Sequence, residues 1–338
     1  MKKMRANHRF QAVMAGHPTD RVPLLDEGIR DDVIDAWKQQ GLPAQSALRD
    51  LFRYDPLHVL EVDWAPQPGW QGAIETATDR AEWRKRLDHA DPKRLASLSA
   101  AVHTAQQRQA EGHLIEFPVH EGLFLTLGID AWASFESVLT LIAERPVWVR
   151  AIMDDQAAFV AALAEQVLQQ VQVDFVSFSE PIASRHGPLI APDTYRALAL
   201  ESYRPLLEVL SRSGVPTIVW TSYGNVRSLI PHVLEVGFDA LWCYERESAQ
   251  MDYSALRREY GHAFGLIGGI DLDAVLQGPT AIDAEFDNTV IPLLQKGGYI
   301  PLADGRVRSN MPFSHYAYYR QRLEEVADQT GNRSLSGG

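Results

Sequence analysis

The sequence is poor in thiols: Cys243 is the only cysteine among its 338 residues. A single cysteine excludes an intramolecular disulfide and any zinc site that needs several thiolates. Long apolar runs are missing too, since no stretch approaches the roughly 18 apolar residues of a membrane span. The first residues, MKKMRANHRF, are basic but lead into polar residues instead of the apolar core of a secretory signal. We therefore expect a cytoplasmic protein.

Positive charge is also scarce, because 32 Lys and Arg residues face 44 Asp and Glu residues, for a net charge of -12. A field of this sign repels nucleic acid and anionic membranes, and no basic cluster overrides it. With 46% apolar and 22% charged residues, the composition is that of an ordinary globular protein. The expected ligand is therefore a small-molecule substrate, with no nucleic-acid or membrane partner.

Short apolar runs of strand length alternate with stretches of helical period. The runs are residues 22–25, 57–62, 114–119, 173–178, 217–220, 240–244, 263–267 and 299–302. Helical period is found at residues 32–40, 93–111, 146–170, 192–213, 226–236, 253–260, 281–295 and 312–329. Such alternation indicates crossover connections and a parallel sheet. Eight units predict an α/β protein with a closed (β/α)8 TIM barrel, whose usual size is about 250 residues.

The surplus length is assigned to an N-terminal extension and to an excursion at residues 64–91, after the second strand. No Gly/Ser linker or charge block divides the chain, so we predict one domain over residues 1–330 and a flexible tail at 331–338. The main alternative is an open doubly wound sheet, which would carry a Gly-rich phosphate turn after its first strand. The sequence there reads DEGIRDD, which is acidic and unsuited to phosphate.

Acidic residues follow seven of the eight apolar runs, and catalytic groups of such barrels gather where the strands finish. Any strand end meets water, so one polar residue there needs no function. Crowded carboxylates, however, need a cation, a helix N-terminus or a basic partner. We predict that the catalytic residues are Glu116, His120, Glu180, Tyr223 and Glu245. We predict substrate contacts from Asp26, Trp64, Trp220, Ser222, Tyr244, Asp304 and Arg306. The candidates for a divalent metal held by hard ligands are Glu116, His120, Glu180 and Glu245.

Seven stretches spread over nearly the whole chain carry a family resemblance. They are RFQAVMAGHPTDRVPLLDEG, GPLIAPDTYRALALESYRPLLEVLSRSGVP, YGNVRSLIPHVLEVGFDAL, MDYSALRREYG, LIGGIDLDAVLQG, KGGYIPLADGRV and FSHYAYYRQRL. As an ordered set they resemble the uroporphyrinogen decarboxylase-like superfamily. The resemblance implies a (β/α)8 barrel that often pairs as a homodimer. It implies either decarboxylation of uroporphyrinogen or methyl transfer between small substrates, corrinoid proteins and thiols.

The sequence departs from both kinds of relative. Methyltransferases of this superfamily commonly hold zinc with a His-x-Cys pair after strand five and a later Cys. Here those places read Trp220, Thr221, Ser222 and Tyr223, and then Ala303-Asp304-Gly305. No thiolate zinc site of that type can form. The decarboxylases carry an Arg-rich stretch after strand one, whereas LLDEGIRDD is mostly acidic and would repel a tetrapyrrole with eight carboxylates.

Three functions follow from this comparison. The first is transfer of a methyl group from a small substrate, such as a methoxylated aromatic, to a corrinoid protein. Glu116, His120, Glu180 and Glu245 would supply a metal site or an acid, and Tyr223 would protonate the leaving oxygen. The second is a divergent decarboxylase, a lyase, in which Arg30, Arg185 or Arg306 would hold the substrate carboxylate. The third is a small-ligand-binding barrel without chemistry. The first is preferred.

Overall fold

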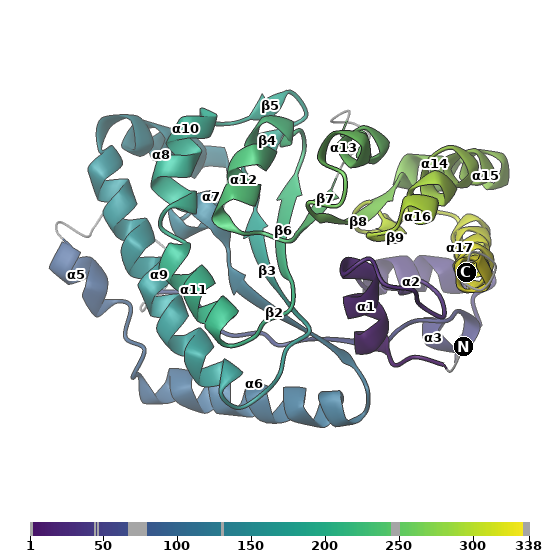
Figure 1. Cartoon of the computed structure of the whole chain (residues 1–338), viewed down its shortest axis with the longest axis horizontal. Coiled ribbons are helices and arrows are strands. Elements are labelled where there is room, and N and C mark those ends of the chain that lie inside the picture. Colours follow the sequence, from purple (N-terminus) through teal and green to yellow (C-terminus); the bar gives the residue numbers. More distant parts are fainter. Residues whose placement is uncertain are drawn as a thin grey trace. The chain divides into compact units, whose positions relative to one another are not determined.

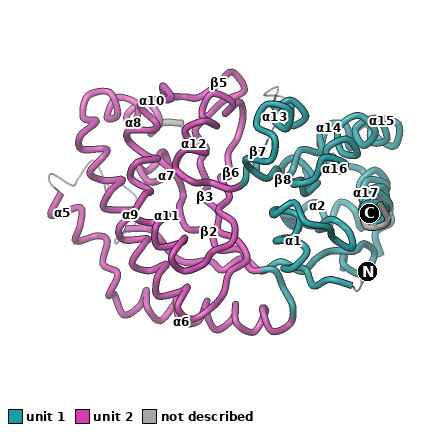
Figure 2. The backbone as a smooth tube through the Cα atoms, viewed as in Figure 1, with its two compact units in different colours: residues 1–57, 112–114, 240–338 teal, residues 58–111, 115–239 magenta. Residues whose placement is uncertain are grey.

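The computed structural model describes residues 3–43, 45, 47–66, 80–129, 132–244 and 251–333 (Figure 1). The chain divides into two compact units, which Figure 2 colours separately. Unit 1 combines residues 1–57, 112–114 and 240–338, and unit 2 combines residues 58–111 and 115–239. Both ends of the chain therefore belong to unit 1, and its middle forms unit 2.

Unit 2 is built on parallel strands with helical crossovers. The strands β2 (Leu114–His120), β3 (Phe175–Glu180) and β6 (Ile218–Tyr223) lie side by side in that order, with β1 (Leu57–Val59) beside β2. These three strands are almost wholly buried, as expected for strands covered on both faces. The register of β2 against β3 shifts between Pro118 and His120, which re-aims the side chains that follow.

The helices of unit 2 are α5 (Arg80–Lys85), α6 (Pro92–Ala110), α7 (Gly122–Thr126), α8 (Trp132–Glu144), α9 (Pro146–Leu168), α10 (Pro192–Tyr195), α11 (Arg204–Arg212) and α12 (Ile230–Val236). A π-helix η1 (Arg196–Leu200), a short η2 (Arg227–Leu229) and a hairpin of β4 (Ala183–Ser184) and β5 (Gly187–Pro188) complete it. The start of helix α6 is fixed by its sequence. The Asp91 side chain accepts the N–H groups of Lys93 and Arg94, and Pro92 has no N–H that needs an acceptor. Helix α9 packs against α11 and η1, and α7 packs against β3.

Unit 1 contains a second set of parallel strands, in the order β7 (Ala240–Tyr244), β8 (Gly265–Ile270) and β9 (Tyr299–Ala303). Its helices are α1 (Ala6–Met14), α2 (Asp31–Lys38), α3 (Leu48–Leu51), α13 (Tyr253–Tyr260), α14 (Leu272–Gln277), α15 (Pro279–Glu285), η3 (Phe286–Val290), α16 (Ile291–Lys296) and α17 (Phe313–Arg333). Helix α17 packs against α14, α15 and α16, and α1 against β9. Each unit therefore contains its own group of parallel strands and its own helices.

The predicted first strand is not a strand. Residues 22–25 are buried but do not pair with a neighbouring strand. Pro23 has no N–H to donate. The N–H of Leu24 donates to the Asp55 carboxylate at 2.8 Å, and the N–H of Asp55 donates back to the carbonyl of Leu24 at 2.9 Å. A side chain thus replaces one partner strand, and the described residues hold seven of the eight predicted strands.

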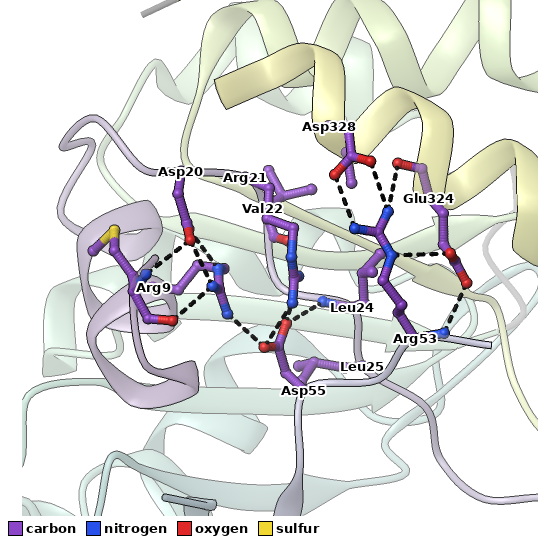
Figure 3. A network of polar contacts seen from close by, with 12 residues as sticks. Arg9, Asp20, Arg21, Val22, Leu24, Leu25, Arg53, Asp55, Glu324 and Asp328 are labelled. Carbon is purple, nitrogen blue, oxygen red and sulfur yellow. Dashed lines mark hydrogen bonds and ion pairs between the residues drawn. The ribbon is translucent and has the colours of Figure 1, made fainter. Parts of the chain in front are cut away.

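Asp55 belongs to a buried network of charges that holds the N-terminal segment (Figure 3). Its carboxylate accepts from Arg9 at 2.5 Å and from Arg21 at 2.7 Å. Arg9 also binds Asp20 in a bidentate manner, at 2.7 and 2.8 Å, and donates to the carbonyl of Met4. Because Arg9 is only 1% exposed, its charge depends on these partners.

A second group in Figure 3 ties the same segment to the last helix. Arg53 donates from Nε and its backbone N–H to Glu324, and from its guanidinium to Asp328. Both acids lie on α17, which also contributes the fully buried Arg320; its guanidinium donates to the carbonyls of Leu25 and Arg53. The N-terminal segment is therefore held by charged side chains more than by backbone pairing.

The sequence predicts most of the other elements at nearly the observed places. Residues 240–244 and 253–260 coincide with β7 and α13. Helices α7 and α8, between β2 and β3, are missing from the prediction. Of the excursion at residues 64–91, the stretch 67–79 lies outside the described residues; of the predicted tail, residues 331–333 belong to α17 and the rest lies outside them. None of the helices in the described part combines the length and the apolar character that crossing a bilayer requires.

Candidate functional site

A buried carboxylate in unit 2, that of Glu180, is surrounded by hydrogen-bond donors. Its Oε2 accepts from the hydroxyls of Tyr195 at 2.9 Å and Tyr203 at 2.7 Å. Its Oε1 accepts from the backbone N–H of Leu123 at 2.7 Å. We call these residues, with His120, the Glu180 cluster. Glu180 and both tyrosines have no exposed surface, so the cluster is a closed polar network in the core.

The π-helix η1 explains how two tyrosines reach one carboxylate. Tyr195 and Tyr203 are eight positions apart, and a helix with 3.6 residues per turn would separate them by about 80°. Within η1 the N–H of Glu201 donates to the carbonyl of Arg196, five residues back. The extra residue in this turn brings both side chains toward one face. The irregular helix therefore positions both donors.

Burial raises the pKa of Glu180 to about 7, against the opposing effect of the hydrogen bonds from Leu123, Tyr203 and Tyr195. The carboxyl is consequently near half protonation at neutral pH. In the same way, burial and the negative charge of Glu180 raise the pKa of both tyrosines well above its ordinary value. Their hydroxyls keep their protons and remain donors.

His120 is the neighbour of this carboxylate on β2. Its ring lies 4.6 Å from the ring of Tyr203 and stacks on Phe178 at 6.0 Å, measured between centroids. Its Nδ1 accepts the N–H of Gly122 at 2.9 Å, so the ring proton resides on Nε2. Burial lowers the pKa of His120 to about 3. His120 is therefore a neutral, packed imidazole.

Glu116 lies on the other face of the same sheet. Its Oε1 accepts the hydroxyl of Ser177 at 2.6 Å. Ser177 and Glu180 are three positions apart on β3, and successive side chains of a strand alternate between faces. Glu116 therefore points away from the Glu180 cluster. Burial also raises the pKa of Glu116.

The structure also places the other predicted residues of unit 2, and the substrate contacts predicted for Trp64, Trp220 and Ser222 stay predictions. Trp64 donates from Nε1 to the carbonyl of Pro118 at 3.0 Å, and Ser222 donates to the carbonyl of Glu180 at 2.6 Å. Trp220 is buried 6.4 Å from the ring of Tyr195, measured between centroids. Tyr223 ends β6 and is 39% exposed. The catalytic role of Tyr223 stays a prediction.

A second group, in unit 1, gathers predicted residues from separate parts of the sequence. Asp26, Tyr244, Asp304 and Arg306 all act electrostatically or by hydrogen bonding on Glu27. We call these five residues the Glu27 cluster. Burial, followed by the negative charge of Asp26, raises the pKa of Glu27 to about 8, while Arg306 and a hydrogen bond with Tyr244 oppose this. A carboxyl of this kind keeps its proton at neutral pH.

The geometry of Glu27 agrees with a protonated carboxyl. Its Oε1 is buried without a hydrogen-bond partner among the described residues. Burying an ionised oxygen in that way is costly. Tyr244 interacts with the carboxyl, and its ring lies 5.6 Å from that of Trp242, measured between centroids. The side chain of Arg306 is exposed. The cluster thus combines a proton donor, a guanidinium and aromatic surface.

The residues present do not fit the zinc ion of the resembled methyltransferases. Cys243 is buried within β7, and its thiol lies 3.6 Å from the carbonyl of Tyr244. In the part of the chain that the structure describes, no three His, Cys, Asp or Glu side chains are arranged as metal ligands. Glu116 and Glu180 occupy opposite faces of one sheet, and Glu245 lies outside the described residues. A metal held by hard ligands is supported by none of these positions and stays a prediction.

The site residues selected from the sequence do not include Tyr195, Tyr203 or Glu27. The two tyrosines belong to a helical stretch, where spacing alone assigns them to packing. Glu27 directly follows Asp26, and the acidic run DEGIRDD was the signal that could have found it. A carboxyl beside another carboxyl has its protonation favoured.

Comparisons with known proteins address the fold. No model of a protein family matches the sequence, and no curated protein matches it significantly. A solved structure with a similar fold is a methyltransferase from Methanosarcina mazei, with a TM-score of 0.62 and 17% identity. The match covers 96% of this chain and 99% of that one. At this identity the likeness shows the fold alone.

Proposed function

We propose that this chain is a methyl-transfer enzyme of the uroporphyrinogen decarboxylase-like superfamily. It would move a methyl group from a small methylated substrate, such as a methoxylated aromatic, to a corrinoid carried by a partner protein. The ordered sequence resemblance and the fold shared with a methyltransferase support this class. The observation that carries the proposal is Glu27, a carboxyl that holds its proton near neutral pH beside Arg306 and Tyr244.

In this mechanism Glu27 is the general acid. An ether methyl leaves as a cation equivalent only if the departing oxygen gains a proton. Glu27 donates that proton as the carbon–oxygen bond breaks and the nucleophilic acceptor bonds to the methyl carbon, which leaves a carboxylate and a phenol. A pKa near the working pH suits a group that must donate and then recover a proton. Tyr244 and Trp242 would contact an aromatic ring, and Arg306 an anionic substituent.

Decarboxylation is the second candidate, and Arg306 is the observation that favours it. Its exposed guanidinium lies close enough to Glu27 to oppose the rise in the carboxyl's pKa. A guanidinium binds a carboxylate in a bidentate manner. In this reaction the substrate carboxylate leaves as CO2, and Glu27 protonates the carbanion that remains. Both candidates need the same proton from the same residue.

One experiment separates the two reactions. Purified protein is incubated with a panel of methoxylated benzoates and with cob(I)alamin as the acceptor, and the phenol, CO2 and the absorbance of the acceptor are followed. Methyl transfer predicts one phenol per methylated acceptor and no CO2. Glu27→Gln should lower the rate by about 100-fold or more, the usual contribution of a general acid. The control Glu208→Gln, an exposed glutamate of α11, should keep the rate. Release of CO2 without a phenol would show that the reaction is decarboxylation and not methyl transfer. An unchanged rate in Glu27→Gln would refute both mechanisms, because each uses Glu27 as the acid.

A further inference from the structure

The carboxylate beside Glu27, that of Asp26, is fixed by two donors. Its Oδ1 accepts the N–H of Gly28 at 2.5 Å, and its Oδ2 accepts the hydroxyl of Tyr316 at 2.8 Å. Both oxygens are therefore engaged within the protein. The substrate contact that the sequence predicts for Asp26 stays a prediction.

Tyr316 is itself held rigidly. It is 1% exposed, its ring lies 4.7 Å from the ring of Trp37, and its hydroxyl lies 3.1 Å from that of Tyr54. The Tyr54 ring lies under the Arg320 guanidinium at 4.1 Å, and Trp37 donates to the carbonyl of Met311 at 2.7 Å. Burial and the charge of Asp26 raise the pKa of Tyr316 well above its ordinary value, so its hydroxyl keeps its proton.

We propose that Asp26 is a positioning residue: fixed by Tyr316 and the Gly28 amide, its negative charge keeps the adjacent Glu27 protonated. The inference rests on the proposed function through the role of Glu27 as the acid. A fixed negative charge one residue away disfavours a second one, because like charges crowded in a partly buried site repel. Tyr316 serves the same end by preventing the carboxylate of Asp26 from turning toward water.

The groups that act on Glu27 divide by sign. Asp26 and Asp304 favour its protonated form, whereas Arg306 and the hydrogen bond with Tyr244 favour its ionised form. This division gives the test an internal control. Neutralising Asp26 and neutralising Arg306 must shift the pKa of Glu27 in opposite directions. A general disturbance of the structure would not shift the pKa of Glu27 downward in one variant and upward in the other.

The test reads the protonation of Glu27 directly, by carbon-13 NMR of the full chain labelled at glutamate carboxyl carbons. Glu27→Gln identifies the resonance, which should titrate near pH 8 in the unaltered protein. Asp26→Asn should lower the midpoint by roughly one pH unit. Arg306→Gln should raise it. Tyr316→Phe should lower it by less than Asp26→Asn does, since the charge remains but is released.

The outcomes are distinct. An unchanged midpoint in Asp26→Asn, or shifts of the same sign in Asp26→Asn and Arg306→Gln, would overturn the role of Asp26. If Tyr316→Phe fails to fold, the near-isosteric Asp26→Asn and the exposed Arg306→Gln still decide the question. The titration needs no substrate. A midpoint near 8 that falls in Asp26→Asn, in a protein without methyl transfer, would keep the positioning role while the proposed function fails.

Discussion

Gly122 lies against the carboxylate of Glu180 with no room for a methyl group between them. A β-carbon added at Gly122 would come within 2.5 Å of Glu180 Oε1 and within 2.4 Å of the carbonyl oxygen of Ser179. The backbone of Gly122 is also left-handed, with φ at 82°. The close approach lets the next N–H, that of Leu123, reach the carboxylate.

Gly122→Ala should therefore destabilise the protein by about 3 kcal/mol or more, combining backbone strain with overpacking. Gly112→Ala is the matched control, because Gly112 has φ at 91° but nothing within 4 Å of an added β-carbon. It should cost only about 1–2 kcal/mol from the backbone. Urea unfolding of both variants measures the difference, and equal losses would show that the contact with Glu180 contributes nothing.

Glu180→Gln should change how stability depends on pH. The native pKa of about 7 lies above the ordinary carboxyl value of 4.5, so the folded state binds the proton more tightly than the unfolded state. This contribution is fully present below the unfolded pKa and is lost as the pH rises toward and through 7. Each unit of pKa difference corresponds to about 1.4 kcal/mol. Unfolding free energies at several pH values between 4.5 and 8 should fall less steeply in Glu180→Gln. Parallel curves would contradict the raised pKa.

Tyr203→Phe removes one donor to Glu180 and should raise the pKa of Glu180 further. It should destabilise the fold by about 1–3 kcal/mol, because the buried carboxylate loses a hydrogen bond. Tyr318→Phe is the comparison: Tyr318 donates to Asp283 at 2.8 Å, and both residues are only half-buried, so water can take the place of the hydroxyl. Thermal unfolding should show a clear loss for Tyr203→Phe and little for Tyr318→Phe. A similar small effect at both positions would mean that the cluster is not a closed network.

Arg9→Met tests the network that holds the N-terminal segment. It leaves Asp55 and Asp20 without their shared guanidinium and should cost about 3–5 kcal/mol. Burial pushes the pKa of Asp20 upward, but the hydrogen bond from Arg9 and the neighbouring charges bring it below its usual value. That contribution is present above the unfolded pKa and lost as the pH falls, so the variant should lose part of the stability gained between acid and neutral pH. Arg108→Met, at an exposed pair with Glu111, should have little effect.

The sequence predicts the fold well where apolar runs are bounded by turns, as at β7 and α13, since local pattern and tertiary structure agree there. It fails at residues 22–25, because a buried loop segment and a strand can have the same apolar pattern. Only the positions of Asp55 and the arginines decide which of the two forms. Those contacts join residues far apart in the sequence, which a local pattern cannot report.

Some residues of the candidate site can be predicted from the sequence pattern, and others depend on the tertiary structure. Asp26, Tyr244, Asp304 and Arg306 are recognisable because each stands at the end of an apolar run. The importance of Glu27 depends on burial, on the adjacent Asp26 and on neighbours from two distant segments. The tyrosines of the Glu180 cluster depend on an irregular helical turn, and no spacing rule for a regular helix would bring them to one carboxylate.

Unit 1 combines segments that are far apart in the sequence, which constrains how the chain folds during synthesis. Trp37, Arg53 and Tyr54 find their partners on or just before α17, more than 260 residues later. At 5–20 residues per second, synthesis of the intervening chain takes roughly 15–50 seconds. Unit 2, which lies wholly within that interval, can complete its core first. Residues 37–54 therefore gain these partners only after all of unit 2 has been synthesised.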